Sequence, residues 1–315
     1  MLNVAGQVRA STLRAIGNTP VVQLQKLVGP ESARVLVKLE FFSPTGSYKD
    51  RMALAMIEGA EARGALRPGM TVVEYTGGST GSSLAFVCAV KGYRCQIVTS
   101  DAFAQEKLRT MRAFGAELTL IPSRGGAITP DLIPRMIEEA RRLSQADDAY
   151  ATDQLNNADS LNGYEQIGRE LLAQVDGPID AFCAAVGTGG MLIGSARALR
   201  AAPNPVRIVV LEPAESPIIS RGAGGAHHVE GTGIGIVPPL LSPDVYDDVR
   251  TVAEQDARDT ARRLTREEGI FAGTSTGLNV RAALDLEREL GPGHTVVTVA
   301  VDSGLKYLAG DLYAD

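Results

Sequence analysis

The sequence predicts an α/β protein of two doubly wound, mainly parallel lobes with the active site in the cleft between them. Three observations support this fold class. The chain has 315 residues, which is more than one typical domain. Short apolar runs alternate with segments of helical periodicity, and most of the 34 glycines fall at the boundaries between them. Such alternation is typical of parallel sheets that helices cover on both faces.

The apolar runs are predicted to be strands because each is short and is bounded by turn residues. They are Val35–Leu39, Thr71–Tyr75, Gln96–Thr99, Leu118–Ile121, Ala181–Val186, Ile208–Leu211 and Thr295–Val301. The segments with a 3.6-residue apolar period are predicted to be helices. They are Tyr48–Arg63, Ser82–Val90, Gln105–Phe114, Leu132–Leu143, Gly163–Gln174, Leu192–Leu199, Gln255–Glu268 and Gly277–Leu290.

Three stretches have no periodicity. We expect Arg124–Thr129, which is Gly-rich, to be a mobile connection, and Asp147–Asn162, which is polar, to cross between the lobes. Ser220–Pro243 has many glycines, and an irregular loop of this length is usually functional or disordered.

The composition excludes several classes of function. A net charge of −6 gives no electrostatic footprint for nucleic acid and no basic patch for an anionic membrane. No uncharged apolar stretch reaches the about 18 residues of a membrane span. The segment Met1–Arg14 lacks the basic-then-apolar pattern of a signal peptide. We therefore expect a cytoplasmic protein with no nucleic-acid or membrane partner.

The cysteines and histidines predict no metal site. Cys88, Cys95 and Cys183 are odd in number and lack CxxC spacing, which argues against disulfides and zinc, so we expect buried thiols. His227 and His228 are adjacent, and neighbouring side chains on an extended segment point to opposite faces.

The most informative segment is Ser43-Pro-Thr-Gly-Ser-Tyr-Lys-Asp-Arg51, which places Lys49 at the start of a predicted helix. A helix N-terminus carries roughly half a positive charge, so the pKa of an ammonium there should fall below about 10.4, and further if it is buried. A neutral lysine can condense with an aldehyde to form a Schiff base. Ser47 is predicted to be the N-cap and Asp50 to complete a capping box. The segment alone also fits a solvated first-turn lysine.

A second loop follows a predicted strand and directly precedes a helix. It reads Thr76-Gly77-Gly78-Ser79-Thr80-Gly81. Its N–H groups and hydroxyls predict an anion site at a helix N-terminus, and a carboxylate suits it. The alternative is a flexible turn, which three glycines and three hydroxyl residues in six positions disfavour.

A third loop, also between a strand and a helix, reads Gly187-Thr188-Gly189-Gly190. The same physics makes it a cradle for phosphate. A dinucleotide fingerprint would need glycine or alanine where Leu192 stands, but Glu212 could mimic the ribose-binding acid, so a nicotinamide cofactor stays an alternative. A P-loop is excluded because no Gly-Lys-Ser/Thr closes the loop.

A fourth loop, Gly273–Gly277, places hydroxyls before the last predicted helix, where a plain helix cap is the alternative. Together the loops offer an amine, a carboxylate site, a phosphate site and a hydroxyl. Pyridoxal 5′-phosphate and an amino-acid substrate need this set. The aldehyde suits Lys49, the phosphate suits Gly187–Gly190, the ring nitrogen suits a hydroxyl, and the substrate carboxylate suits Thr76–Thr80.

With these motifs the chain resembles the cysteine synthase and cystathionine β-synthase family, whose members are pyridoxal-phosphate enzymes of fold type II (tryptophan synthase β-like). The resemblance runs from Ile16-Gly-Asn-Thr-Pro20 to about Tyr307. The motifs that carry it are Pro44–Arg51, Thr76–Gly81, Gly187–Gly190, Glu230–Gly235 and Gly269–Gly277.

The resemblance implies a role for each matching position. Lys49 would form the Schiff base and later move the proton of the substrate Cα, and Ser275 would face the ring nitrogen. The phosphate would lie at Gly187, Thr188, Gly189, Gly190 and Met191. The substrate carboxylate would lie at Thr76, Gly77, Gly78, Ser79, Thr80 and Gln154, and Gly231 would line the substrate entrance. Ser79 would also touch the cofactor.

The resemblance also implies the domain organisation. Residues 1–315 would form one catalytic unit, and two units would form a homodimer. A smaller, mobile lobe at 46–155 would carry the carboxylate loop, and a larger lobe at 12–45 and 156–315 would carry the phosphate loop.

Two single positions and one short stretch depart from the family's pattern. Ser79 stands where the family usually has an asparagine that bonds the cofactor's 3′-oxygen. Met191 replaces the usual threonine after the phosphate glycines, and Gln154-Leu-Asn-Asn157 replaces the usual Gln-Phe-Asn-Pro. These changes keep the cofactor assignment and leave the donor substrate open.

The expected reaction is β-replacement on an O-activated L-serine. It would pass through a bound aminoacrylate to which sulfide or a thiol adds, giving L-cysteine or a related β-substituted alanine. A hydroxyl partner such as Ser275 cannot keep the ring nitrogen protonated as a carboxylate would, and this favours departure of a β leaving group. The alternatives are β-elimination, as in a serine/threonine dehydratase or cysteine desulfhydrase, and a relative that has lost turnover.

Overall fold

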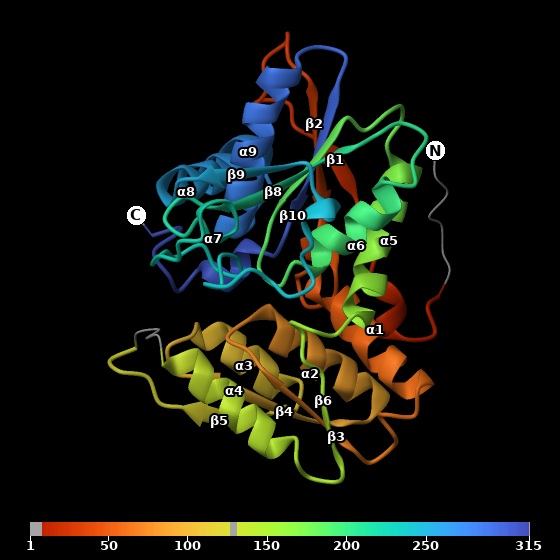
Figure 1. The fold of residues 1–315 in the computed structure, drawn as a ribbon, viewed down its shortest axis with the longest axis vertical. Coiled ribbons are helices and arrows are strands. Elements are labelled where there is room, and N and C mark those ends of the chain that lie inside the picture. The colour runs from red at the N-terminus through yellow and green to blue at the C-terminus, as the bar shows by residue number, and fades with distance from the viewer. Residues whose placement is uncertain (1–7, 127–130, 315) are drawn as a thin grey trace.

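A computed structural model describes residues 8–126 and 131–314. It has two mainly parallel sheets, as the alternation of strands and helices along the sequence predicts. In Figure 1 the larger sheet and its helices form the upper part of the molecule and the smaller sheet forms the lower part. The predicted α/β class is therefore confirmed. Residues 127–130, which include the end of the predicted connection Arg124–Thr129, lie outside the described residues.

The larger sheet has six strands in the order β1-β2-β10-β7-β8-β9. All neighbours are parallel except β1, which pairs antiparallel with β2 at the edge. Their bounds are β1 Val21–Gln23, β2 Arg34–Leu39, β7 Ala181–Ala185, β8 Arg207–Pro213, β9 Asp248–Val252 and β10 Thr295–Ala300. Sequence periodicity did not predict β1 and β9, which are the two edge strands.

The smaller sheet has four parallel strands in the order β5-β4-β3-β6. Their bounds are β3 Thr71–Tyr75, β4 Arg94–Ser100, β5 Glu117–Ile121 and β6 Ala149–Ala151. The strand β6 corrects the expectation that Asp147–Asn162 is irregular throughout. The crossing between the sheets is the shorter segment 152–158, because helix α5 begins at Asp159.

The helices connect successive strands, as parallel sheets require. Their bounds are α1 Lys49–Ala62, α2 Ser79–Lys91, α3 Gln105–Ala113, α4 Leu132–Leu143, α5 Asp159–Gln174, α6 Gly190–Leu199, α7 Ile218–Arg221, α8 Glu254–Arg263 and α9 Thr274–Leu290. The predicted helix Gln255–Glu268 is α8 followed by one π-helical turn, Leu264–Glu268. Between α7 and the 3₁₀ turn Pro243–Val245 the chain is irregular, as expected for Ser220–Pro243.

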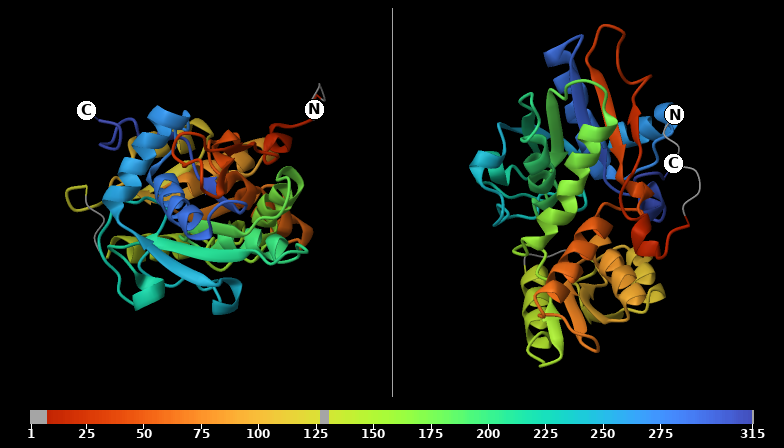
Figure 2. Two further views of the ribbon diagram at one scale, coloured as in Figure 1. Left: turned by 90° about the horizontal axis from the view of Figure 1, so that it is seen from above. Right: turned by 90° about the vertical axis from the view of Figure 1, so that its right-hand side faces the viewer.

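Both faces of each sheet are covered by helices. Along β10, Val297 and Val299 belong to a core shared with α5 and α6, whereas Val296 and Ala300 belong to a core shared with α8 and α9. The two further views in Figure 2 show these layers from above and from the side. Successive side chains of a strand point to opposite faces of the sheet, so β10 contributes to two separate hydrophobic cores.

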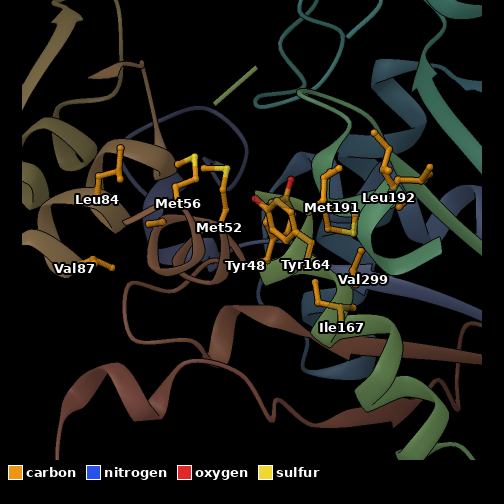
Figure 3. Close-up of a cluster of buried hydrophobic side chains, with 14 of the residues drawn as sticks. Tyr48, Met52, Met56, Leu84, Val87, Tyr164, Ile167, Met191, Leu192 and Val299 are labelled. Carbon is orange, nitrogen blue, oxygen red and sulfur yellow. The ribbon is translucent and has the colours of Figure 1, made fainter. Parts of the chain in front are cut away.

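One of these cores continues into the smaller lobe. It includes Met52 and Met56 of α1, Leu84 of α2 and Ile167 of α5, all of them fully buried. Figure 3 shows this cluster running from Leu84 and the methionines past the two tyrosines Tyr48 and Tyr164 to α6. Helix α1 therefore ties the two sheets together. No helix of the described residues has the length and hydropathy to cross a membrane.

Candidate active site

The loop that carries Lys49 is fixed to the carboxyl end of strand β10. The N–H of Tyr48 donates to the carbonyl of Val301 at 3.3 Å, and the N–H of Ser303 donates to the carbonyl of Gly46 at 3.0 Å. Lys49 is the first residue of α1, as the Pro/Gly turn predicts. The ring of Tyr48 packs edge-on against Tyr164 of α5, with centroids 5.4 Å apart (Figure 3).

The predicted capping box is wrong. The N-cap is Tyr48, and Asp50 bonds backwards to Thr45, whose N–H and hydroxyl donate to the two carboxylate oxygens at 2.8 and 2.6 Å. Ser47 Oγ still accepts from the N–H of Lys49 at 3.3 Å. Asp50 therefore closes the turn before the helix, and the Thr45 hydroxyl also lies 3.2 Å from Ser83 Oγ of α2.

The surroundings of Lys49 favour a neutral amine. Burial lowers the pKa of Lys49 to about 8, and the carboxylate of Glu74 opposes this shift. The predicted direction is confirmed, and the partial burial of Lys49 disfavours the interpretation as a solvated surface lysine. Burial also raises the pKa of Glu74 to about 7, although Thr152, Gln154 and Tyr75 donate hydrogen bonds to this carboxylate.

Lys49 shares one pocket with the third loop. The pocket is lined by Tyr48, Lys49, Ala185, Gly187, Thr188, Gly189, Met191 and Leu192. The N–H groups of Thr188 and Gly189 make no hydrogen bond within the described part of the chain, and they precede the N-terminus of α6. Amine and anion cradle therefore face the same space, although 138 residues separate Lys49 from Gly187.

Two glycines of this loop are required by their surroundings. Gly189 has a backbone φ of +82°, a value that residues other than glycine rarely adopt. A Cβ on Gly187 would overlap the carbonyl oxygen of Gly231. The predicted phosphate loop and the predicted entrance loop are therefore in backbone contact. Met191 lines the pocket but points its side chain into the hydrophobic cluster (Figure 3).

Ser275 lies in the first turn of α9. Its hydroxyl is buried and has no hydrogen-bond partner among the described residues. The next residue, Thr276, accepts from the N–H of Val301 at 2.9 Å, which ties this turn to the strand that also holds the Lys49 loop. A buried hydroxyl without a partner is costly, so a polar group that is not part of the chain fits here.

The second loop is linked to Gln154. The hydroxyl of Thr80 donates to Gln154 Oε1 at 2.8 Å, and Gln154 Nε2 donates to the carbonyl of Tyr75 at 3.3 Å. Thr76 Oγ1 accepts from the N–H of Gly78 at 3.1 Å. A Cβ on Gly77 would collide with the ring of Phe103. The predicted carboxylate residues from 76 to 80 and Gln154 are therefore brought together at one end of β3.

Sequence reasoning missed several groups around this loop. Lys306 donates to Ser79 Oγ at 3.1 Å, and Lys107 pairs with Glu230. The carboxylate of Glu74 accepts a hydrogen bond from the backbone N–H of Gln154 at 3.1 Å. Glu230 opens the motif Glu230–Gly235, but no motif marks Lys107, Lys306 or Glu74, because their partners lie 80 to 227 residues away in the chain.

Glu212 and the two adjacent histidines are bonded to other parts of the chain. The carboxylate of Glu212 accepts from the N–H groups of Ile219 and Ser220 at 2.8 and 3.0 Å, which caps α7. His227 bonds the carbonyl of Gly233, whereas His228 bonds Glu254, so the two imidazoles have separate partners.

The residues around the pocket fit pyridoxal phosphate. Lys49 is a poised amine, the unbonded N–H groups of Thr188 and Gly189 suit a phosphate, and the unpartnered Ser275 hydroxyl suits a ring nitrogen. Comparison with known proteins decides the matter. Residues 12–302 match the family described as pyridoxal-phosphate dependent enzyme. The chain belongs to this family.

Similar proteins refine this assignment. A cysteine synthase of Staphylococcus aureus is 42% identical over 301 residues, covering 95% of this chain and 95% of that protein. The crystal structure of an O-ureido-L-serine synthase is 36% identical with a TM-score of 0.90, covering 98% of this chain and 97% of that one. A hydrogen sulfide-producing enzyme of Fusobacterium nucleatum is 33% identical with a TM-score of 0.88, covering 96% and 100%.

The predicted family, fold type and cofactor are therefore confirmed, and the nicotinamide interpretation is wrong. The relatives also bear out β-replacement on an O-activated serine as the chemistry predicted from the sequence.

Proposed function

We propose that this member of the family transfers the alanyl group of an O-activated L-serine to a small nucleophile, sulfide or a thiol, and releases L-cysteine or a related β-substituted alanine. The observation that carries the proposal is the pocket in which Lys49 meets the Gly187–Gly189 turn. The smaller lobe of 46–155 supplies the amine and the carboxylate loop, and the larger lobe of 12–45 and 156–315 supplies the phosphate loop.

In this proposal each residue has a defined task. When bound, pyridoxal phosphate supplies an aldehyde and a conjugated ring that delocalises negative charge. Lys49 would hold the cofactor covalently and, as a free amine, would take the proton from the substrate Cα as general base. The backbone N–H groups of Gly187–Met191 would bind the phosphate, and the hydroxyl of Ser275 would donate to the ring nitrogen.

The substrate is oriented by the second loop. Thr76, Gly77, Gly78, Ser79 and Thr80 surround the α-carboxylate with N–H groups and hydroxyls at the start of α2, and Gln154 offers its amide. The bond from Thr80 to Gln154 holds this set together before substrate arrives. Gly231 lines the entrance, and closing the lobes keeps water from the reacting atoms.

The test is turnover of purified enzyme with O-acetyl-L-serine, O-phospho-L-serine, L-serine or L-cysteine, in the presence of sulfide or a small thiol. Mass spectrometry should show a β-substituted alanine from at least one donor. Lys49→Ala should lose both the cofactor colour and all turnover while keeping the far-UV circular dichroism of the parent. If no donor gives product or perturbs the cofactor spectrum, this substrate class is wrong.

A second candidate is β-elimination. It is favoured by the similarity to the hydrogen sulfide-producing enzyme of Fusobacterium nucleatum. Release of pyruvate and ammonia without an added nucleophile, at a rate above that of replacement, would establish it in place of the first.

The setting of the enzyme is part of the same proposal. We place it in the cytoplasm, because its three cysteines are free and buried, and reduced thiols are typical of a reducing compartment. We also propose a homodimer, which light scattering at several protein concentrations would test directly.

A further inference from the structure

Two lysines reach across the gap between the lobes at the carboxylate loop. Lys306, in the 3₁₀ turn Gly304–Tyr307 of the larger lobe, donates to Ser79 Oγ of the smaller lobe at 3.1 Å. Lys107, on α3 of the smaller lobe, has Nζ 5.1 Å from the ring centre of Tyr307. A Cβ on Gly78 would lie 3.9 Å from the same Nζ. We call Lys107 and Lys306 the two-lysine site.

Lys107 has an unusual partner. Its side chain is 4% exposed and forms an ion pair with Glu230, whose side chain is 48% exposed. Glu230 precedes Gly231 in the irregular segment between α7 and Pro243. The buried ammonium of Lys107 needs an anionic partner. The carboxylate of Glu230 is half-exposed on an irregular segment, so it can move into water when another anion replaces it beside Lys107. Glu230 therefore occupies a position that the carboxylate or phosphate of a ligand can take.

Lys306 has unused capacity. An ammonium has three N–H donors, and the hydrogen bond to Ser79 is the one that Lys306 makes within the described part of the chain. The nearby carboxylates have their own donors. Asp302 accepts from the hydroxyl of Tyr307 at 2.9 and 3.2 Å, and Asp50 accepts from Thr45. Neither forms an ion pair with Lys306 among the described residues.

We propose that the two-lysine site binds a second anionic group of a substrate, in addition to the α-carboxylate, and that Glu230 leaves Lys107 when this group binds. The group is a phosphate ester or a carboxylate, carried either by the leaving group of the donor or by the acceptor. The inference rests on the proposed function, because the amino-acid substrate must already lie on Thr76–Thr80 for its far end to reach the site.

The test compares charged and neutral substrates on the holoenzyme. For the donor, kcat/KM is measured with O-phospho-L-serine and with O-acetyl-L-serine, using sulfide. For the acceptor, it is measured with mercaptoacetate and with 2-mercaptoethanol, using O-acetyl-L-serine. The variants are Lys107→Met and Lys306→Met. Lys91→Met is the matched control, since Lys91 is a half-buried lysine of α2 that pairs with Glu61 away from the site.

One charged substrate, donor or acceptor, should lose at least about tenfold in kcat/KM in either variant, which is the loss expected for one hydrogen bond to a charged group. Its neutral counterpart should change by less than about threefold. The arm that responds identifies which substrate carries the charge. Glu230→Gln, which removes the competing charge, should lower KM for that charged substrate and leave the neutral one unchanged.

Equal losses with charged and neutral substrates would overturn the inference, because the lysines would then hold the α-carboxylate or the lobes themselves. A rise in KM in Glu230→Gln would overturn it as well. If Lys107→Met does not fold, Lys306→Met and Glu230→Gln decide, because both side chains are partly exposed. Failure of the proposed function gives a different result: the parent enzyme turns over none of the donors.

Discussion

In its proposed role, Lys49 must be neutral to react and must still be held where the cofactor would bind. The structure separates these two requirements. The hydrogen bonds of Gly46 and Tyr48 to the end of β10 fix the position of the residue. Burial lowers its pKa to about 8, and Glu74 alone among the named groups pulls it upward. With a pKa of about 8, roughly a tenth of the amine is unprotonated at pH 7, far more than for a lysine with its ordinary pKa of about 10.4.

The rate at which the apoprotein captures pyridoxal phosphate should therefore rise with pH through a midpoint near 8, the pKa of Lys49, and not near 10.5. The sign follows because only the unprotonated amine attacks the aldehyde. In Glu74→Gln the carboxylate no longer stabilises the ammonium, so the midpoint should move to lower pH. Stopped-flow absorbance after mixing apoprotein with cofactor measures both.

Glu61→Gln is the matched control for Glu74→Gln. Glu61 lies on α1 and bonds Lys91 and Tyr93, away from the pocket, so this change should leave the midpoint where it is. A midpoint near that of free lysine in the parent protein, or no difference between the parent and Glu74→Gln, would contradict this account of the amine.

At the scale of elements, helix α1 is held in place by buried charge. Arg51 bonds both oxygens of Glu40 at 2.7 and 2.9 Å and both oxygens of Glu170 at 2.7 and 2.8 Å. Lys38 of β2 pairs with Glu170 at 2.7 Å. Two cations and two anions thus link α1, β2 and α5 two residues after Lys49. The predicted motif Pro44–Arg51 therefore contains both the residue proposed to react and the anchor of its helix.

Arg51→Met should lower the free energy of unfolding by about 3–5 kcal/mol, because it leaves the carboxylate of Glu40 buried without its counter-charge. Arg63→Met is the control. That arginine follows the end of the same helix and pairs with Asp159, but its side chain is 53% exposed, so the loss should be much smaller than in Arg51→Met. Urea unfolding followed by circular dichroism measures both, and similar losses for the two variants would refute the argument.

The elements that the sequence predicted well are those with a strong apolar period. Helix α4 and strand β3 have the predicted bounds, Leu132–Leu143 and Thr71–Tyr75. The strands that were missed, β1, β6 and β9, lie at sheet edges and are short or polar, so pairing with a neighbour defines them and composition does not. The predicted capping box is wrong for a related reason. The carboxylate of Asp50 accepts from Thr45 and not from the N–H of Ser47, and residue spacing alone does not distinguish these two donors.

The features of the candidate site also divide into those that a local sequence signal predicts and those that depend on tertiary packing. Its four loops could be predicted, because glycines and hydroxyls between a strand and a helix are a local signal. The charged groups around them could not be predicted. The pairs Lys306 with Ser79, Lys107 with Glu230 and Glu74 with Gln154 join segments whose proximity depends on the packing of two lobes.

At the scale of the whole molecule, the two sheets share a hydrophobic core. The cluster that contains Leu84 of α2 and Ile97 of β4 in the smaller lobe also contains Phe182 of β7 and Val297 of β10 in the larger one. Tyr48, which precedes Lys49, belongs to this cluster as well. A lobe that shares its core cannot lose its packing without exposing apolar surface of its neighbour.

We therefore expect the two lobes of the apoprotein to unfold in one cooperative transition. Leu84→Ala, which leaves a cavity at a fully buried position of the smaller lobe, should destabilise the whole chain by about 2–5 kcal/mol and shift a single melting curve. Leu305→Ala removes a side chain that is 64% exposed and should change stability by less than about 0.5 kcal/mol. Calorimetry and circular dichroism should give the same midpoint for each variant. Two separate transitions, of which Leu84→Ala moves only one, would mean that the shared core does not couple the lobes, and that the active site lies between two independently stable domains.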